Sequence, residues 1–118
     1  MAEERILIGV VDDHPQTATS ISGSLDYAGY RTFEAYNGRD AIDMAKKMKP
    51  ALLISDIVME GIDGYAIAKE LKTQKIIFIT AYPVNRVKLT GLKNVVGVLT
   101  KPVSPEQVVK AVQKALKK

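Results

Sequence analysis

Short runs of apolar, mostly β-branched residues recur along the chain and predict the strands of a sheet. The runs at 6–11, 52–56 and 76–80 are almost continuously apolar, without an alternation of apolar and polar residues. Such runs are typical of strands buried on both faces, as in a parallel sheet that helices cover. Two further runs, 32–36 and 95–99, predict two more strands.

Between these runs, apolar residues recur at the three- and four-residue spacing of amphipathic helices. The first helical segment opens at Pro15 and stops at Gly29. The second follows Asn37, a helix-capping residue type, and stops at Pro50. At 104–107 the order Ser-Pro-Glu-Gln predicts a further capped helix start. The inner face of the second helix is expected to consist of Ala41, Ile42, Ala45 and Met48.

Two more helical segments are predicted to be short. Ile67 and Leu71 predict a short helix after a glycine-containing loop, and the segment around Val84 and Val87 predicts a weak, irregular one. Five strands thus alternate with five helices. This alternation predicts right-handed crossovers and a doubly wound α/β fold, in which a five-stranded parallel sheet carries helices on both faces.

Composition limits the possible classes of protein. The 118 residues suit one domain, which we expect to cover 1–118, and 47% hydrophobic with 25% charged residues is typical of a globular protein. The absence of cysteine excludes disulfides, thiol catalysis and cysteine-based metal sites. No apolar run is long enough to span a bilayer, and the acidic start is unlike a signal peptide. We therefore expect a cytoplasmic protein with no membrane partner.

Charge is distributed unevenly along the chain. The formal net charge is +4, but residues 1–85 carry nine basic and twelve acidic residues, whereas 86–118 carry eight basic residues and only Glu106. The simplest interpretation of the basic third is a solvated, lysine-rich helix surface. It would also suit an acidic partner or a nucleic acid.

Residues that can carry chemistry lie at the carboxyl ends of the predicted strands. Asp12 and Asp13 follow the first strand, Asp56 ends the third, Thr80 ends the fourth, and Lys101 follows the fifth. The carboxyl ends of parallel strands share one edge of the sheet, where ligands bind. We therefore expect these side chains to converge.

The expected cluster indicates phosphoryl transfer. Three neighbouring carboxylates repel one another, which is unfavourable unless a divalent cation neutralises them. Mg²⁺ prefers one or two carboxylates together with water and phosphate oxygens. The ammonium and hydroxyl groups nearby suit an anion. In the absence of cysteine and of a plausible nucleophilic serine, the acceptor would be a carboxylate, which would form an aspartyl phosphate.

Over essentially its whole length the sequence resembles the receiver domains of two-component response regulators, of the single-domain, CheY-like chemotaxis type. The resemblance rests on the motifs at 11–15, 56–59, 63–64, 80–81 and 101–102. It implies a flavodoxin-like sheet with the strand order 2-1-3-4-5. Because the chain ends about where such a receiver ends, we expect no attached output domain.

The resemblance also implies roles for the acidic residues. Asp56 would accept a phosphoryl group from a histidine kinase or a phosphotransfer protein. Mg²⁺ would be held by Asp12, Asp13, Asp56 and the backbone carbonyl of Val58. His14, which follows the acidic pair, is interpreted as a loop residue rather than a ligand.

Further roles follow from the same resemblance. Thr80 would bind a phosphoryl oxygen, Lys101 would pair with the phosphoryl group, and the bond before Pro102 would be cis. The protein would be a switch that changes its binding to a downstream protein, and it would catalyse only its own phosphorylation and dephosphorylation. Thr80 and Val98 occupy the switch positions of the family, although Val98 stands where the family has an aromatic residue.

Two further positions depart from the family pattern. Glu60 stands where members often have a proline, and its extra carboxylate is expected to alter metal affinity or the rate of dephosphorylation. Val103 stands where an aromatic residue is frequent, and the departures at Val98 and Val103 suggest an altered output. With Val98 in place of the aromatic side chain, we expect the signal to move through the loop after Thr80 and the weak fourth helix. We expect the basic segment 86–118 to dock an acidic partner protein.

Two other functions are less consistent with the sequence. A haloacid-dehalogenase-type phosphotransferase or phosphatase needs a second aspartate two residues after the nucleophile, where this chain has Val58, and there is no room for a cap domain. A basic nucleic-acid-binding module would be expected to show a helix-turn-helix or a set of stacking aromatic residues, and the sequence shows neither. We therefore expect no direct nucleic-acid binding.

Overall fold

Five parallel strands form one sheet in the order β2-β1-β3-β4-β5. The computed structural model describes residues 5–117. The strands are β1 (Leu7–Val11), β2 (Arg31–Ala35), β3 (Leu52–Asp56), β4 (Ile76–Thr80) and β5 (Val95–Thr100). The helices are α1 (Pro15–Tyr27), α2 (Gly38–Met48), α3 (Gly64–Glu70), α4 (Arg86–Leu89) and α5 (Pro105–Leu116). The predicted doubly wound α/β fold and its strand order are confirmed.

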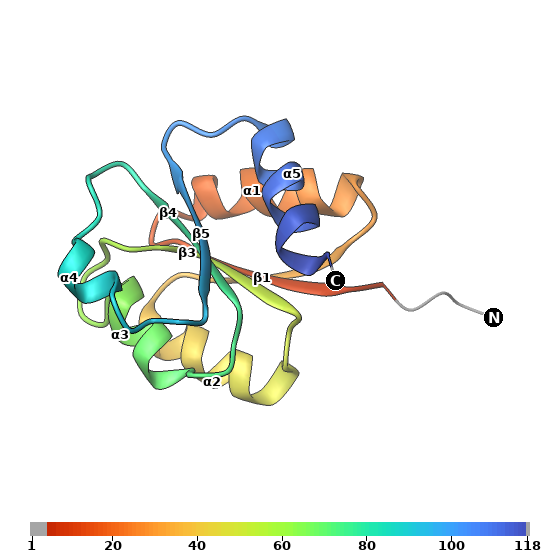
Figure 1. Ribbon diagram of the computed structural model, residues 1–118. Helices are drawn as coiled ribbons and strands as arrows, with labels where there is room; N and C mark the ends of the chain where they lie inside the picture. The colour runs from red at the N-terminus through yellow and green to blue at the C-terminus, as the bar shows by residue number, and fades with distance from the viewer. Residues whose placement is uncertain (1–4, 118) are drawn as a thin grey trace.

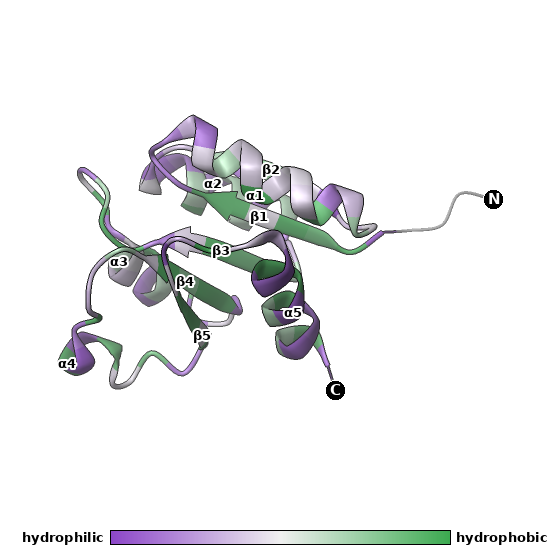
Figure 2. Cartoon of the chain, turned by 90° about the horizontal axis from the view of Figure 1, so that it is seen from above, coloured by the Kyte–Doolittle hydropathy of each residue, from purple (hydrophilic) through white to green (hydrophobic). Residues whose placement is uncertain are grey.

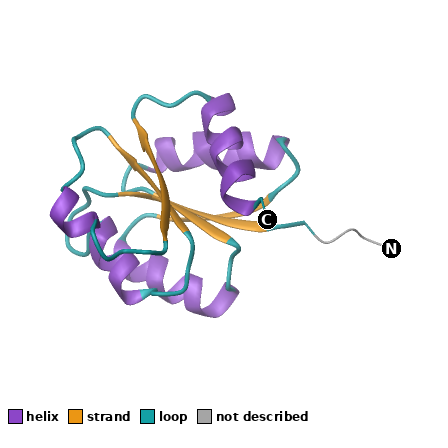
Figure 3. Cartoon of the chain, viewed as in Figure 1, coloured by secondary structure: helices purple, strands orange, loops and turns teal. Residues whose placement is uncertain are grey.

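The helices lie in two layers, one on each face of the sheet. Figures 1 and 3 show α1 and α5 on one face and α2, α3 and α4 on the other. Within residues 5–117, no helix combines the length and the apolar character needed to cross a membrane.

The core consists of two apolar clusters separated by the sheet. Strands β3 and β4 are buried along their whole length, so their successive side chains enter both clusters. This is why their sequences are apolar without alternation, as the hydrophobic strands in Figure 2 show. Central members are Ile8, Leu25, Ile54, Ile77 and Val112 on the α1/α5 face and Phe33, Ala41, Leu53, Ile67 and Phe78 on the opposite face.

Side-chain caps define several helix ends. The side chain of Asn37 accepts a hydrogen bond from the backbone N–H of Asp40 at 2.8 Å, which caps α2. Ser104 and Gln107 form the predicted capping box of α5. One detail of α2 was predicted wrongly, because Met48 is exposed rather than part of the inner face. The chain turns into the left-handed region at Lys49 and leaves the helix there.

The α4–β5 side of the molecule is the least regular. Helix α4 has only four residues, and Val87 within it is 84% exposed. The register of β5 against β4 shifts between Ile76 and Ile77, and beyond the shift Val98 pairs with Phe78. The side chain of Val98 is 37% exposed. The prediction that the fourth helix is short and irregular is therefore confirmed.

Candidate functional site

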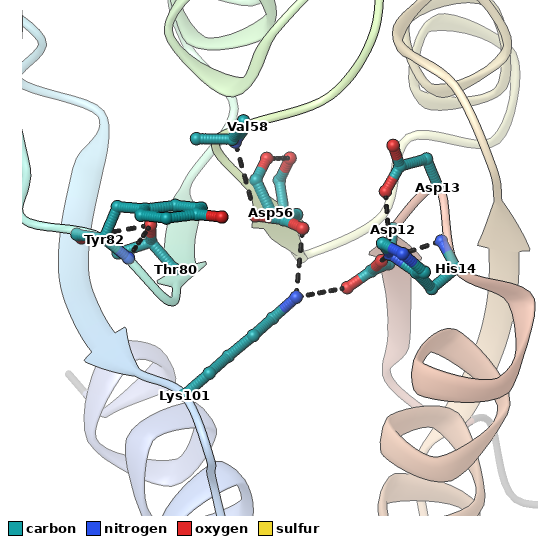
Figure 4. A network of polar contacts seen from close by, with 9 residues as sticks. Asp12, Asp13, His14, Asp56, Val58, Thr80, Tyr82 and Lys101 are labelled. Atoms are coloured by element: carbon teal, nitrogen blue, oxygen red, sulfur yellow. Dashed lines mark hydrogen bonds and ion pairs between the residues drawn. The ribbon is translucent and has the colours of Figure 1, made fainter.

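The predicted site residues meet at the carboxyl edge of the sheet (Figure 4). Lys101 reaches across this edge and places its Nζ 3.0 Å from Oδ2 of Asp56 and 3.1 Å from Oδ2 of Asp12. Asp12 and Asp56 are 1% and 6% exposed, so the ammonium group bridges two buried carboxylates. An isolated buried charge is very costly, and the ammonium group of Lys101 is the cation that compensates both carboxylates.

The charge of Lys101 is supported by its partners. Burial on its own would lower the pKa of the ammonium group, but the hydrogen bonds that it donates to Asp56 and Asp12 and the negative charges of these carboxylates together outweigh burial and raise the pKa. The lysine therefore carries a full positive charge at neutral pH, directly beside the carboxylate that follows β1 and the one that ends β3.

Asp13 and His14 lie at the open side of the site. The His14 Nδ1 atom is 3.1 Å from Oδ1 of Asp13 and 3.4 Å from Oδ1 of Asp12. The backbone N–H of His14 donates a hydrogen bond to Oδ1 of Asp12 at 2.9 Å. Sequence reasoning interpreted His14 as a loop residue, and only the structure shows its imidazole against both carboxylates. The three side chains bring donor atoms within 4.8 Å of one another.

Thr80 and Val58 line the opposite side of the site. The Thr80 hydroxyl accepts a hydrogen bond from the backbone N–H of Tyr82 at 3.1 Å, and it lies 3.2 Å from the Tyr82 carbonyl oxygen, to which it donates. The backbone N–H of Val58 donates to Oδ1 of Asp56 at 3.3 Å. The threonine thus ties the loop after β4 to the site edge, and the loop after β3 bonds to the Asp56 carboxylate.

Close backbone packing holds the two flanking loops in place. The backbone N–H of Gly64 donates to the carbonyl of Ile57 at 2.8 Å, and a Cβ at Gly64 would lie only 2.7 Å from the Asp56 carbonyl oxygen. On the other side, the backbone N–H of Lys101 donates to the Thr80 carbonyl at 2.8 Å, and the Lys101–Pro102 bond is cis. The cis geometry is the one that the resemblance implied.

The donor set suits a hard divalent cation. Asp12, Asp13 and Asp56 bring three carboxylates to one edge, and the single ammonium group of Lys101 offsets only part of their charge. Carboxylate and carbonyl oxygens are the ligands that hard cations prefer. Asp13 remains about one-third exposed, so its carboxylate is accessible to an ion and its water ligands.

The chain is similar both to a curated relative of about its own length and to longer ones. It is 32% identical to sporulation initiation phosphotransferase F of Bacillus subtilis over 123 residues, which cover 98% of this chain and 96% of that protein. It is 33% identical to the alkaline phosphatase synthesis transcriptional regulatory protein PhoP of Bacillus subtilis over 104 residues, which cover 84% of this chain and 43% of that protein. The chain spans about half the length, or less, of the first curated relatives that it matches.

A solved structure and a family model agree with these relatives. The chemotaxis protein CheY4 of Vibrio cholerae has a TM-score of 0.86 and 26% sequence identity, with 96% of this chain and 100% of that chain covered. The family model described as the response regulator receiver domain matches residues 8–113. This chain therefore belongs to the family of response regulator receiver domains.

Proposed function

We propose that the chain accepts a phosphoryl group on Asp56, from a histidine kinase or a phosphotransfer protein, in a two-component pathway. The observation that carries the proposal is the position of Asp56. Its carboxylate lies at the end of the central strand β3, 3.0 Å from the ammonium group of Lys101 and next to the acidic residues that follow β1. A nucleophilic carboxylate beside a fixed cation is the arrangement that phosphoryl transfer to aspartate requires.

The transfer step is an in-line substitution at phosphorus. A carboxylate oxygen of Asp56 forms the new P–O bond while the P–N bond of a phosphohistidine breaks and its electron pair returns to the imidazole nitrogen. The two oxygens of Asp56 already have distinct partners, since Oδ2 faces Lys101 and Oδ1 accepts from Val58. We assign the Oδ1 side, with its long 3.3 Å hydrogen bond, as the attacking oxygen.

The acidic residues would hold Mg²⁺ in this role. Asp12, Asp13, Asp56 and the backbone carbonyl of Val58 are the proposed protein ligands. When bound, the ion neutralises charge on the carboxylates and on the phosphoryl oxygens. The excess of carboxylates over ammonium groups at this edge supports the assignment.

Lys101 and Thr80 would then bind the transferred group. The ammonium group, which now bridges Asp12 and Asp56, moves onto a phosphoryl oxygen without leaving the site. Thr80 can donate to a phosphoryl oxygen only if its hydroxyl gives up the bond to the Tyr82 carbonyl. Phosphorylation is therefore coupled to the loop after β4 and to α4, which follows that loop.

This coupling makes the domain a switch rather than an enzyme acting on other substrates. Val98 offers only a small side chain at the strand-five position, so we assign the output to the loop after Thr80 and to α4. The basic 86–118 side would bind an acidic downstream protein. The proposal includes the single domain over 1–118 and the cytoplasmic location that the sequence predicts.

The proposal is tested by incubating the protein with Mg²⁺ and a small phosphodonor such as acetyl phosphate. Intact-mass spectrometry is expected to show one added phosphoryl group that is lost in mild base, as acyl phosphates are. Asp56→Asn should abolish the added mass. Full labelling of the Asp56→Asn protein would show that the acceptor has been assigned wrongly.

Hydrogen exchange tests the switch separately. With beryllofluoride as a mimic of the phosphoryl group, amides between 81 and 95 are expected to change protection, because no residue of this segment is fully buried and segments with few buried contacts open most easily. Changes confined to the loops after β1 and β3 would contradict the proposed output route.

A further inference from the structure

A groove of about 700 Å³ separates α3 from the segment that contains α4 and leads into β5. Both walls lie on the same side of the molecule, where Figure 1 shows α3 and α4 as neighbours. Tyr65, Ala68, Val87 and Leu92 contribute to its lining. The volume lies within the range of about 300–1,000 Å³ that is typical of ligand-binding clefts. This groove is separate from the phosphoryl site at the carboxyl edge of the sheet.

The groove exists because α4 is short. A helix of four residues covers little of the sheet, and Val87 points away from the core with 84% of its surface exposed. The segment packs against the core through half-buried side chains such as Leu89 and Leu92, and polar contacts attach it to α3. The Tyr65 hydroxyl accepts from the backbone N–H of Asn85 at 2.7 Å, and the Asn94 amide donates to the carbonyls of Ala68 and Leu71. These contacts fix the distance between the two walls, and apolar side chains of the lining lie between them.

The rim of the groove is strongly basic. Lys69 and Lys72 line it on the α3 side, Lys88 and Lys93 line it on the α4 side, and Asp63 is the single acidic residue. None of the four ammonium groups forms an ion pair with a residue in the described part of the chain. Asp63 is already engaged, since its carboxylate caps α3 through the N–H of Ala66. The rim is therefore complementary to a negatively charged ligand.

The lining favours a peptide over a nucleic acid. Single-stranded nucleic acids need exposed aromatic faces for stacking. The one aromatic ring of this groove, Tyr65, packs edge-on against Phe78 with 5.5 Å between ring centroids, and Lys88 lies over it at 5.5 Å. Apolar lining residues such as Val87 and Leu92 are instead suited to contact an aliphatic or aromatic side chain of a bound peptide, which would anchor the peptide in the groove.

Both walls are attached to the phosphoryl site. Gly64, the first residue of α3, packs against the backbone of Asp56 and Ile57. The opposite wall follows the loop that Thr80 holds through Tyr82. A change in the bonding of Asp56 and Thr80 therefore reaches the two walls by separate short routes, and it can alter the width of the groove.

We propose that the groove between α3 and α4 is the docking site for an acidic peptide segment of a partner protein, with an apolar side chain of that segment seated between Tyr65 and Val87. The proposal deepens the signalling function proposed above and names the surface and the chemistry of the partner. The electrostatic attraction brings the segment to the rim, and the apolar anchor determines its register.

The test uses a fluorescein-labelled peptide in which glutamates flank a Leu-Phe pair, with binding measured by fluorescence anisotropy. The double charge reversal Lys69→Glu with Lys93→Glu is expected to weaken binding about tenfold or more, and added salt should weaken wild-type binding. The matched control is Arg39→Glu with Lys47→Glu on α2, two exposed residues outside both the groove and the 86–118 segment, which changes the net charge equally. Val87→Ser should also weaken binding, and it removes only exposed apolar surface.

Loss of affinity in the groove variants, with the control pair close to wild type, supports the proposal. Equal losses in both charge-reversal pairs, or wild-type affinity in the Val87→Ser protein, would overturn it, as would tight binding of a single-stranded oligonucleotide that competes with the peptide. Phosphoryl uptake at Asp56 is measured on the same variants. Normal uptake with lost peptide binding assigns the defect to the groove, whereas a wild-type protein that binds the peptide but takes up no phosphoryl group contradicts the proposed function alone.

Discussion

At the scale of single residues, Lys101 determines the electrostatics of the site. Its ammonium group is within 3.1 Å of one oxygen from each of two buried carboxylates, Asp12 and Asp56. The interaction joins β5 to β1 and β3, which are distant in sequence. Removing the shared cation would leave both buried carboxylates uncompensated, whereas removing one carboxylate leaves Lys101 paired with the other.

Lys101→Met is accordingly expected to lower the free energy of unfolding by about 3 kcal/mol at neutral pH, since it leaves two buried carboxylates without a cation. Asp56→Asn is the contrasting change, because it removes one of the negative charges and should be close to neutral. Urea unfolding of the two variants beside the wild type measures both effects. Equal stabilities of Lys101→Met and wild type would show that the bridge is energetically unimportant.

A second residue, Gly64, keeps the backbone of α3 against the strand that ends at Asp56. A Cβ there would lie 2.7 Å from the Asp56 carbonyl oxygen and 2.8 Å from the Ile57 Cα, so the backbone would have to move. Gly64→Ala is expected to destabilise the fold by about 1–3 kcal/mol and to slow phosphoryl uptake.

Gly23→Ala is the matched control for this substitution. Apart from the adjacent residues and the backbone of α1 itself, no atom lies within 4 Å of a Cβ at Gly23, so the change should stabilise by about 0.5–1 kcal/mol. Thermal melts of both proteins and the rate of labelling by a phosphodonor check the pair. A Gly64→Ala protein as stable and as reactive as wild type would contradict the packing argument.

At the scale of elements, Glu34 connects β2 to α1. Its carboxylate accepts hydrogen bonds from Thr19 and Ser22 of α1, and from Tyr36 beyond the end of β2. Burial would raise the pKa of Glu34, but the hydrogen bonds from Ser22, Tyr36 and Thr19 outweigh it and lower the pKa. Because folding lowers the pKa of Glu34, the hydrogen bonds to its carboxylate contribute stability that is fully present above pH 4.5. This stability is lost as the pH falls through the pKa of Glu34 in the folded protein.

Ser22→Ala is therefore expected to cost about 1 kcal/mol at neutral pH, at the low end for a hydrogen bond to a charged group because Glu34 is partly solvated. The difference from wild type should shrink as Glu34 becomes protonated in acid. Ser24→Ala is the control, since Ser24 donates only to a carbonyl of its own helix. Unfolding curves recorded across the acidic range test this, and a pH-independent difference would argue against the role of Glu34.

Most helices and strands could be predicted from the sequence, and the reason why a prediction succeeded or failed differs from one element to the next. The runs that became β3 and β4 are buried on both faces, so their apolar pattern had clear ends at Asp56 and Thr80. Met48 was placed wrongly because helical spacing does not reveal that the chain leaves the helix at Lys49. The register shift of β5 and the contacts of Glu34 depend on neighbours distant in sequence, and no local pattern encodes them.

At the scale of the whole molecule, one edge of the sheet gathers the charges that the chain separates in sequence. The convergence of Asp12, Asp56 and Lys101 could be predicted, since parallel strands place their carboxyl ends together. The bridging position of the lysine, the imidazole of His14 and the bonds of Thr80 to Tyr82 could not, because rotamers depend on the packed site. The roles of these residues stay predictions until they are measured.

Mg²⁺ binding is expected to stabilise the whole fold, since a ligand that binds only the folded state shifts the unfolding equilibrium. The gain should reach about 2.7 kcal/mol when the ion is present at about 100 times its Kd. Asp13→Ala should remove most of this gain, because Asp13 is the accessible carboxylate of the proposed site. Differential scanning calorimetry with and without Mg²⁺ measures the effect, and identical melting curves for the wild type would count against a working metal site.

The most direct test of the account is to locate the phosphoryl group within the chain. After labelling with acetyl phosphate and Mg²⁺, borohydride reduction converts an aspartyl phosphate to homoserine, and tandem mass spectrometry of the digested protein finds its position. We predict homoserine at position 56 and at no other aspartate. Homoserine at position 12 or 13, or a protein that gives no homoserine under conditions that label a known receiver domain, would contradict the central claim that Asp56 is the phosphoryl acceptor.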